Sequence, residues 1–212
     1  MQRKDYLLYA VTDRSWLNGD SLVRQVKEAL EGGVTLLQLR EKDMPFEEFV
    51  ALAKEIHEIT MQYGVPLIIN DNVEVAIAIG AEGVHLGQED MELGHARARL
   101  GNDKIIGISA HTVEEARRAQ DNGADYIGTG AVFTTTTKSD AHEVALRTLK
   151  DICSAVTIPV VAIGGITKDN ITMLKGTGIV GVAVVSAIFA SKEIGRATEE
   201  LADLLRQVVE ED

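Results

Sequence analysis

The sequence predicts a (β/α)8 barrel formed by a single domain over residues 1–212, and three observations lead to this prediction. Eight short apolar segments alternate with eight helix-like segments, an order that calls for a parallel sheet. The length of 212 residues fits eight compact strand–helix units without large insertions. Most apolar segments end in polar or glycine residues. Because a parallel barrel brings the C-terminal ends of its strands to one face, these residues are expected to form one site.

The strand-like segments are rich in Val, Ile and Leu, which is the composition of buried parallel strands. They are Leu7–Val11, Thr35–Leu39, Leu67–Ile69, Gly83–Leu86, Ile105–Ile108, Tyr126–Gly128, Val160–Ile163 and Val180–Val185. The alternative fold is a doubly wound open sheet. The barrel is favoured because no G-x-G-x-x-G sequence follows the first strand and because eight units complete a barrel.

The helix-like segments have apolar residues at helical spacing or recognisable ends. They are Ser21–Glu31, Phe46–Tyr63, Val73–Ile79, Glu92–Leu100, Val113–Asn122, Ala145–Ala155, Thr167–Leu174 and Ile194–Val209. The longest connection without clear periodicity runs from Phe133 to Val144. A loop of this length in a compact domain is often functional.

Composition excludes several classes of protein. The net charge of −12 argues against nonspecific nucleic-acid binding, which needs a broad basic surface. No segment approaches the roughly 18 apolar residues of a membrane span, and no signal peptide is evident. The single cysteine, Cys153, permits no intrachain disulfide and favours a cytoplasmic location. Cys153 lies in a predicted helix and is expected to be a buried structural residue rather than a nucleophile.

The second strand carries polar residues suited to an anionic ligand. Strand alternation places Leu36, Gln38 and Arg40 on one side. An amide in an apolar strand costs free energy unless it has partners, so Gln38 is either a satisfied core residue or a ligand contact, and we favour the contact. Arg40 and Lys42 either form a solvated pair with Glu41 or clamp a diphosphate, with Arg as a planar fork and Lys as a point charge.

Two aspartates follow two different strands. Mg²⁺ is often bound by one or two carboxylates together with substrate phosphates and water, so Asp71 and Asp90 on one barrel face would suit it. Helix capping is the alternative, above all for Asp71, which precedes the helix Val73–Ile79. Asn70 is a candidate for the same cap or for holding a phosphate.

The fifth strand ends at Ser109. Thr112, with Glu115 at capping-box spacing, is the better cap for the next helix, which leaves Ser109 available for a ligand. His111 is either a hydrogen-bonded structural residue or an acid/base group. His85 lies inside a strand and is expected in the barrel interior.

The last two strands end in a pattern typical of a phosphate site. In many barrels the loops after strands seven and eight present backbone N–H groups to a phosphate. Here the corresponding segments are Gly164–Gly165 and Val184–Ser186, which include Gly165, Val185 and Ser186. Lys138, in the threonine-rich loop after the sixth strand, either closes over the ligand or is a solvated loop residue.

Taken together, these segments resemble the thiamine-phosphate synthase family, and the similarity runs in order along nearly the whole chain. The similar segments are Tyr9–Arg14, Leu37–Lys42, Leu67–Asp71, Gly83–Asp90, Ile106–Thr112, Asp125–Gly128, Thr135–Lys138, Pro159–Ile166 and Val184–Ser186. The resemblance implies a (β/α)8 transferase of thiamine biosynthesis. Its substrates would be hydroxymethylpyrimidine diphosphate and a thiazole phosphate. The thiazole nitrogen would displace diphosphate from the pyrimidine CH₂ group.

The resemblance also implies a role for each candidate residue. Mg²⁺ would be bound by Asp71 and Asp90, and the diphosphate by Arg40, Lys42, Asn70 and Lys138. The pyrimidine would contact Gln38 and Ser109. The thiazole phosphate would be bound by Thr135, Thr137, Gly165 and Ser186. Arg40, Lys138 and Ser109 would be the catalytic residues. Whether the chain forms a homo-oligomer stays open at this point.

One segment departs from the family pattern. The usual Gly-Pro-Val-Phe-Pro-Thr reads Gly-Ala-Val-Phe-Thr-Thr over residues 130–135. Proline restricts a loop's unfolded ensemble, so greater loop mobility is expected here. Three rivals stay open: a thiazole tautomerase using His111, a non-catalytic ligand-binding regulator, and an unrelated phosphate-sugar isomerase barrel. Retention of both aspartates together with Arg40, Lys42 and Lys138 favours the synthase.

Overall fold

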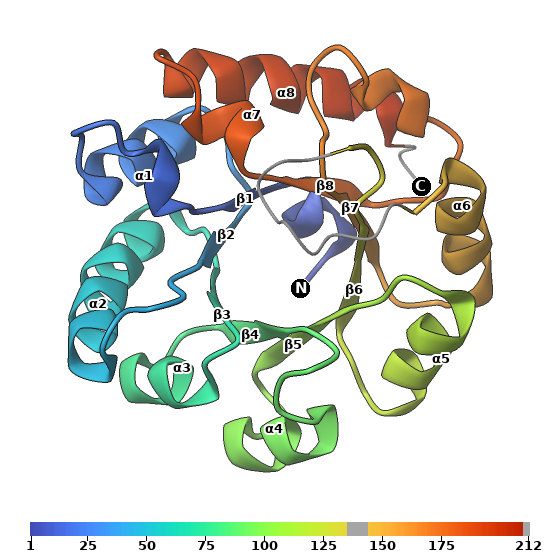
Figure 1. Ribbon diagram of the computed structural model, residues 1–212, viewed down its shortest axis with the longest axis horizontal. Coiled ribbons are helices and arrows are strands. Elements are labelled where there is room, and N and C mark those ends of the chain that lie inside the picture. The colour runs from blue at the N-terminus through green and yellow to red at the C-terminus, as the bar shows by residue number, and fades with distance from the viewer. Residues whose placement is uncertain (135–143, 210–212) are drawn as a thin grey trace.

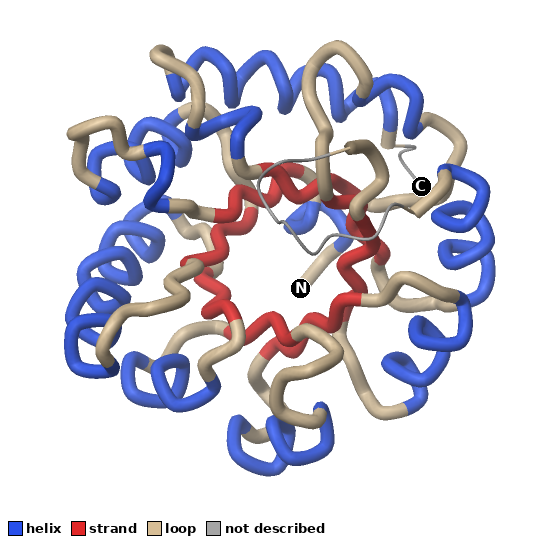
Figure 2. Tube along the Cα trace, in the orientation of Figure 1, coloured by secondary structure: helices blue, strands red, loops and turns tan. Residues whose placement is uncertain are grey.

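Eight parallel strands close into a barrel in sequence order, which confirms the predicted fold class. The computed structural model describes residues 1–134 and 144–209. The strands are β1 (Leu8–Val11), β2 (Leu36–Leu39), β3 (Leu67–Asn70), β4 (Gly83–Leu86), β5 (Ile105–Ser109), β6 (Tyr126–Gly130), β7 (Val160–Ile163) and β8 (Gly181–Val184). They form a ring inside an outer layer of helices (Figures 1 and 2). Each predicted strand is present with its ends within two residues of those expected.

The helices cover the outside of the barrel (Figure 2). They are α1 (Leu22–Glu31), α2 (Phe46–Tyr63), α3 (Val73–Ile79), α4 (Leu93–Leu100), α5 (Val113–Asp121), α6 (Leu146–Ala155), α7 (Ser186–Phe189) and α8 (Ile194–Val208). Three 3₁₀ turns add η1 (Arg3–Tyr6), η2 (Arg14–Trp16) and η3 (Ile171–Leu174). Within the described ranges, no helix is long and apolar enough to cross a bilayer.

The predicted helix over Thr167–Leu174 is wrong, since only the 3₁₀ turn η3 forms there. The side chain of Asn170 accepts a hydrogen bond from the Thr167 N–H and donates one to the Gly165 carbonyl. Such side-chain bonds to the backbone compete with helix formation. The short helix α7 escaped the sequence reading because four residues cannot display a helical period.

The barrel interior is a separate cluster from the core beneath the helices, and strand alternation decides which residue lies in which. The interior cluster contains Tyr6, Tyr9, Val11, Leu36, Ile68, Tyr126, Val161, Val180 and Ala183. Leu37 and Leu39 belong to the outer core instead. Leu36 therefore lies inside, and the same alternation places Gln38 on the inward side of β2, where it contacts Tyr9.

A glycine in β5 makes room for Tyr126, one of the large tyrosines of the interior. A Cβ atom on Gly107 would lie 2.0 Å from the ring of Tyr126, its register partner in β6. We expect Gly107→Ala to lower the free energy of unfolding by about 1–3 kcal/mol, because an overpacked core must displace side chains or backbone. Gly94→Ala is the matched control. A Cβ at this position in α4 meets no described heavy atom within 4 Å.

Urea denaturation of the two variants measures the difference. Gly94→Ala is expected to be neutral or to stabilise by up to about 1 kcal/mol, because alanine is the better helix former. Equal unfolding midpoints for both variants would contradict the role assigned to Gly107.

Candidate functional site

The predicted site residues lie at the C-terminal ends of strands around one mouth of the barrel. Arg40 and Lys42 follow β2, Asn70 ends β3 and Asp71 comes directly after it, Asp90 follows β4, and Ser109 ends β5. Gly165 follows β7, while Val185 and Ser186 follow β8. Because the strands are neighbours in this order, the first group covers one side of the mouth and the second group the opposite side. Thr135, Thr137 and Lys138 lie outside the described residues.

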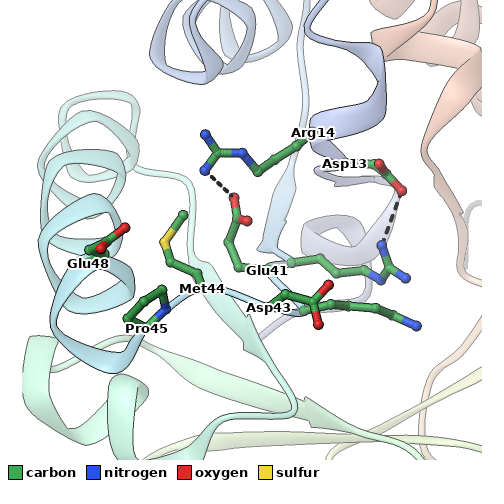
Figure 3. A pocket seen from close by; sticks show the side chains of 9 residues that line it. Asp13, Arg14, Glu41, Asp43, Met44, Pro45 and Glu48 are labelled. Atoms are coloured by element: carbon green, nitrogen blue, oxygen red, sulfur yellow. Dashed lines mark hydrogen bonds and ion pairs between the residues drawn. The ribbon is translucent and has the colours of Figure 1, made fainter.

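Arg40 is held in place by residues that follow β1. Its backbone N–H donates to the hydroxyl of Thr12 at 3.0 Å. Its guanidinium Nη1 lies 3.1 Å from Oδ2 of Asp13 (Figure 3). The other oxygen of Asp13 accepts hydrogen bonds from the backbone and hydroxyl of Ser15. Both oxygens of the Asp13 carboxylate are thus held by contacts, and the carboxylate orients the guanidinium group of Arg40.

The solvated pairing with Glu41, one of the two alternatives for Arg40, is therefore not what forms. Glu41 instead lies 3.6 Å from Arg14, and its side chain is only 4% exposed (Figure 3). Burial raises the pKa of the Glu41 carboxyl above its ordinary value, and the nearby Arg14 partly offsets this. Arg40 therefore pairs with Asp13, while Glu41 pairs with Arg14.

A polar cavity of about 500 Å³ lies between β2 and the start of α2. It is lined by Asp13, Arg14, Arg40, Glu41, Lys42, Asp43, Met44, Pro45 and Glu48 (Figure 3). The basic residues that line it, Arg14, Arg40 and Lys42, could bind an anion that is accompanied by a cation. Neither Asn70 nor the two predicted metal ligands line this cavity, so it covers only the β2 side of the predicted site.

Asp71 has an unusual backbone conformation at the end of β3. Its φ of 61° lies in the left-handed region, which residues other than glycine rarely adopt and which clusters at functional sites. Its N–H donates to the carbonyl of His85 in β4 at 2.9 Å. The cap of α3 is Asn72, whose side chain accepts from the Val75 N–H. Capping, the alternative interpretation, therefore does not explain Asp71.

Asp90 lies in a tight loop after β4. One of its carboxylate oxygens accepts a hydrogen bond from the Gly87 N–H at 2.6 Å. Gln88, in the same loop, donates to the carbonyl of Ser109 at 2.6 Å and accepts from Arg118 at 2.7 Å. These bonds attach the loop to β5 and α5 and fix where the Asp90 carboxylate can lie.

Asp71 and Asp90 are ligands of the kind that a magnesium ion shared with a phosphate would take. They follow adjacent strands, and each is constrained by backbone contacts. Among the described residues no group of three or more His, Cys, Asp or Glu could hold a metal. Two carboxylates are nevertheless what Mg²⁺ commonly takes when phosphate oxygens and water complete its shell.

A continuous hydrogen-bonded chain crosses the barrel from β2 to β5. Gln38 donates to the Tyr9 hydroxyl at 2.6 Å, and this hydroxyl lies 2.9 Å from that of Tyr126. The Tyr126 hydroxyl lies 2.9 Å from Nδ1 of His85, and Nε2 of His85 lies 3.0 Å from the Ser109 hydroxyl. Burial raises the pKa of both tyrosines, so the phenols stay protonated at neutral pH. His85 lies in the interior, as predicted.

The glycines after β7 shape the opposite side of the mouth. Gly165 has a φ of 63°, and a Cβ there would lie 2.4 Å from the Thr134 carbonyl oxygen. The absence of a side chain thus lets the loop after β6 cross directly over the loop after β7. Ser186 begins α7 immediately after Val185. Loop packing is thus an alternative reason for Gly165, and the phosphate cradle stays a prediction.

His111 and Cys153 have structural roles. The His111 N–H donates to Glu115 at 2.7 Å, and its ring lies 3.4 Å from the same carboxylate. Thr112 caps α5, as predicted, by accepting from the Glu115 N–H. Cys153 is partly buried in α6, and burial raises its pKa to about 12.

We expect the Cys153 thiol to react slowly in the folded protein. A pKa near 12 leaves almost no thiolate at pH 8, and the thiolate is the reactive species. Titration with a chromogenic disulfide reagent should show labelling at pH 8 at least about tenfold faster in urea than in buffer. Equal rates in the two conditions would contradict this assignment.

Two parts of this site were missed by reasoning from sequence. Asp13 was not predicted as the partner of Arg40, and Tyr9 and Tyr126 were not predicted as hydrogen-bonding residues. A signal for Asp13 existed, since it follows the first strand as Arg40 follows the second. Alternation also places Tyr9 on the same side of its strand as Val11.

Known proteins similar to this chain agree with one another. The family model described as thiamine monophosphate synthase matches residues 8–188. The thiamine-phosphate synthase of Clostridium tetani (strain Massachusetts / E88) is 48% identical over 203 residues, covering 96% of this chain and 97% of the relative. That of Clostridium novyi (strain NT) is 50% identical over 201 residues, covering 94% and 98%. The solved structure of a thiamine phosphate pyrophosphorylase from Pyrococcus furiosus has 41% identity and a TM-score of 0.91, covering 98% and 99%.

Proposed function

The chain belongs to the thiamine monophosphate synthase family and is a transferase, and on this basis we propose that its substrates are hydroxymethylpyrimidine diphosphate and thiazole phosphate. The bond between the pyrimidine CH₂ carbon and the diphosphate oxygen breaks, and its electron pair leaves with the diphosphate. The lone pair of the thiazole nitrogen forms the new C–N bond. The products are thiamine phosphate and diphosphate.

The observation that carries this proposal is the grouping of two carboxylates with two cations on neighbouring strands. Asp71 and Asp90 follow β3 and β4, next to Arg40 and Lys42 after β2. A tautomerase moves a proton and has no use for such a set. Its candidate acid/base group, His111, is held by Glu115. The arrangement therefore favours group transfer with a diphosphate leaving group.

The chemistry asks for charge neutralisation and positioning more than for proton transfer. Mg²⁺ held by Asp71 and Asp90 would supply positive charge to the leaving diphosphate. Arg40 contributes a planar fork whose direction is set by Asp13. Lys42, Asn70 and Lys138 complete the diphosphate site in this proposal, Lys138 from outside the described residues. Fixed charges of this kind need no rearrangement as the leaving group develops charge.

The acceptor substrate is placed on the opposite side of the mouth. Gly165, Val185 and Ser186 follow β7 and β8, where barrels commonly bind phosphate. Thr135 and Thr137 belong to this subsite in the proposal but lie outside the described residues. Gln38 and Ser109, on β2 and β5, are assigned to the pyrimidine between the two phosphate ends. This order holds the two reactants in line across the mouth.

The reconstituted reaction tests the proposal directly. Purified protein is mixed with both substrates and Mg²⁺, and thiamine phosphate is quantified by chromatography. Formation of thiamine phosphate that stops on addition of a chelator and resumes with excess Mg²⁺ is the expected result. A well-folded protein that forms no product would refute the substrate assignment.

We also propose a cytoplasmic location. The single cysteine and the acidic composition support it. Fractionation of cells that express the chain, with detection in the cytosolic and membrane fractions, is the test.

A further inference from the structure

The chain of hydrogen bonds inside the barrel joins the two residues assigned to the pyrimidine. Gln38 and Ser109 lie on β2 and β5, which are separated by two other strands. Tyr9, Tyr126 and His85 connect them through contacts of 2.6–3.0 Å. Both tyrosines are fully buried, with no more than 2% of their surface exposed. The connection therefore runs through protein groups rather than through bulk water.

The proton of each group fixes the direction of the next bond. A phenol has one proton, and a neutral imidazole has one N–H and one acceptor nitrogen. When the Gln38 NH₂ donates to Tyr9, Tyr9 donates to Tyr126, and Tyr126 donates to Nδ1 of His85. The His85 proton is then on Nε2 and is donated to Ser109. In this state Gln38 retains its carbonyl oxygen and Ser109 its hydroxyl proton for a ligand.

Turning the Gln38 amide around reverses every bond. Its carbonyl oxygen then accepts from Tyr9, which accepts from Tyr126, which accepts from Nδ1–H of His85. Nε2 of His85 has no proton in this state and accepts from the Ser109 hydroxyl. Gln38 now retains its NH₂ group and Ser109 its lone pairs. In both states Gln38 keeps at least one N–H and one carbonyl lone pair, so the direction of the chain decides whether the Ser109 proton is free for a ligand.

We propose that Tyr9, Tyr126 and His85 are positioning residues that couple Gln38 to Ser109, so that the orientation of the Gln38 amide decides whether the Ser109 hydroxyl proton is free for the ligand. An aminopyrimidine would fix this orientation when its exocyclic NH₂ donates to the Gln38 carbonyl oxygen, because the Ser109 proton is then free to be donated to a ring nitrogen. The inference rests on the proposed function only in naming the pyrimidine diphosphate as the ligand.

Calorimetric binding of hydroxymethylpyrimidine diphosphate, without the second substrate, measures the coupling. Gln38→Ala, Ser109→Ala and the double variant form a double-mutant cycle. In otherwise wild-type protein the double variant should lose at least about fivefold less affinity than the product of the two single losses. In a Tyr126→Phe background the affinity loss of the double variant should equal the product of the two single losses within about twofold, because the hydrogen-bonded chain is interrupted.

Tyr6→Phe is the matched control background. Tyr6 is a buried phenol whose ring lies 5.1 Å from that of Tyr126, but the chain does not pass through it. The cycle should keep its coupling in Tyr6→Phe. General loosening of the interior would affect both backgrounds alike, so a loss confined to Tyr126→Phe identifies the hydrogen bond.

Nitrogen-15 spectra of the histidine rings give an independent readout, with the His85 signals assigned by their absence in His85→Gln. Binding of the pyrimidine diphosphate should shift the His85 ring signals in Ser109→Ala protein, where the effect can travel only from Gln38. The shift should disappear in Ser109→Ala/Tyr126→Phe. Unchanged His85 signals on binding, or coupling that persists in Tyr126→Phe, would overturn the proposal while thiamine phosphate is still formed. Protein that binds no pyrimidine diphosphate would refute this coupling and the proposed function together.

Discussion

Replacing Asp71 or Asp90 with asparagine is expected to slow Mg²⁺-dependent release of diphosphate by about 100-fold or more, since a preorganised charge at the leaving group contributes that much. Each substitution removes one negative oxygen from a two-carboxylate site. The two aspartates come from adjacent strands, so neither substitutes for the other. Raising Mg²⁺ should recover part of the lost rate, because the weaker site then fills by mass action.

Asparagine is the sharper substitution because it preserves the local backbone. Asp71 has a φ of 61°, and asparagine is among the residues that tolerate this left-handed region. Alanine there would add a conformational cost of roughly 1–2 kcal/mol. At position 90 an amide oxygen can still accept the hydrogen bond from the Gly87 N–H. The unfolding temperature of both asparagine variants should therefore stay within a few degrees of the wild type.

Product formation at several Mg²⁺ concentrations and calorimetric Mg²⁺ binding with diphosphate provide the measurements. Asp121→Asn is the control, because Asp121 is an exposed aspartate at the end of α5 and takes no part in the site. It should leave both quantities unchanged. Wild-type rates in both Asp71→Asn and Asp90→Asn would rule out the metal assignment.

The fold and the positions of most candidate residues could be predicted because both depend on local patterns. The alternation of strands and helices gives the barrel, and residue parity gives the inward side of β2 with Leu36 and Gln38. Parallel closure then brings the strand ends together without any knowledge of contacts. The residue that caps a helix could also be predicted in part, since Thr112 caps α5 as expected.

Most of what could not be predicted depends on contacts between distant segments. Gln38 was identified as a polar residue in need of a partner, but that partner is Tyr9, 29 positions earlier. Arg40 pairs with Asp13, 27 positions earlier, whereas the sequence suggested its neighbour Glu41. At Asn170, side-chain bonds to Thr167 and Gly165 defeated a helix that spacing had indicated. In the first two cases the deciding hydrogen bond joins segments that meet only after the chain has folded, whereas at Asn170 it is a local bond that competes with the helix.

Arg40→Lys is expected to lower kcat/KM for the pyrimidine diphosphate by about 10–100-fold. Lysine keeps the positive charge but replaces a planar fork with a single point charge. The guanidinium of Arg40 is largely buried and oriented by Asp13 at 3.1 Å, so its remaining N–H groups have a fixed direction toward an anion. Loss of a charge-assisted bidentate contact costs about 1.5–3 kcal/mol, which corresponds to this range.

Arg14→Lys separates the effect of the fork from the effect of charge in the same cavity. Arg14 also lines the cavity after β2, but it is 53% exposed and pairs with Glu41 at the longer distance of 3.6 Å. Arg14 is half-exposed, its distance to Glu41 is long, and lysine keeps the charge, so the change should stay within about threefold. Steady-state kinetics together with the affinity for inorganic diphosphate report both variants. If the two substitutions had equal effects, the cavity would act through its total charge, and Asp13 would have no role in aiming Arg40. If only Arg40→Lys weakens diphosphate binding, the direction imposed by Asp13 is part of how the leaving group is held.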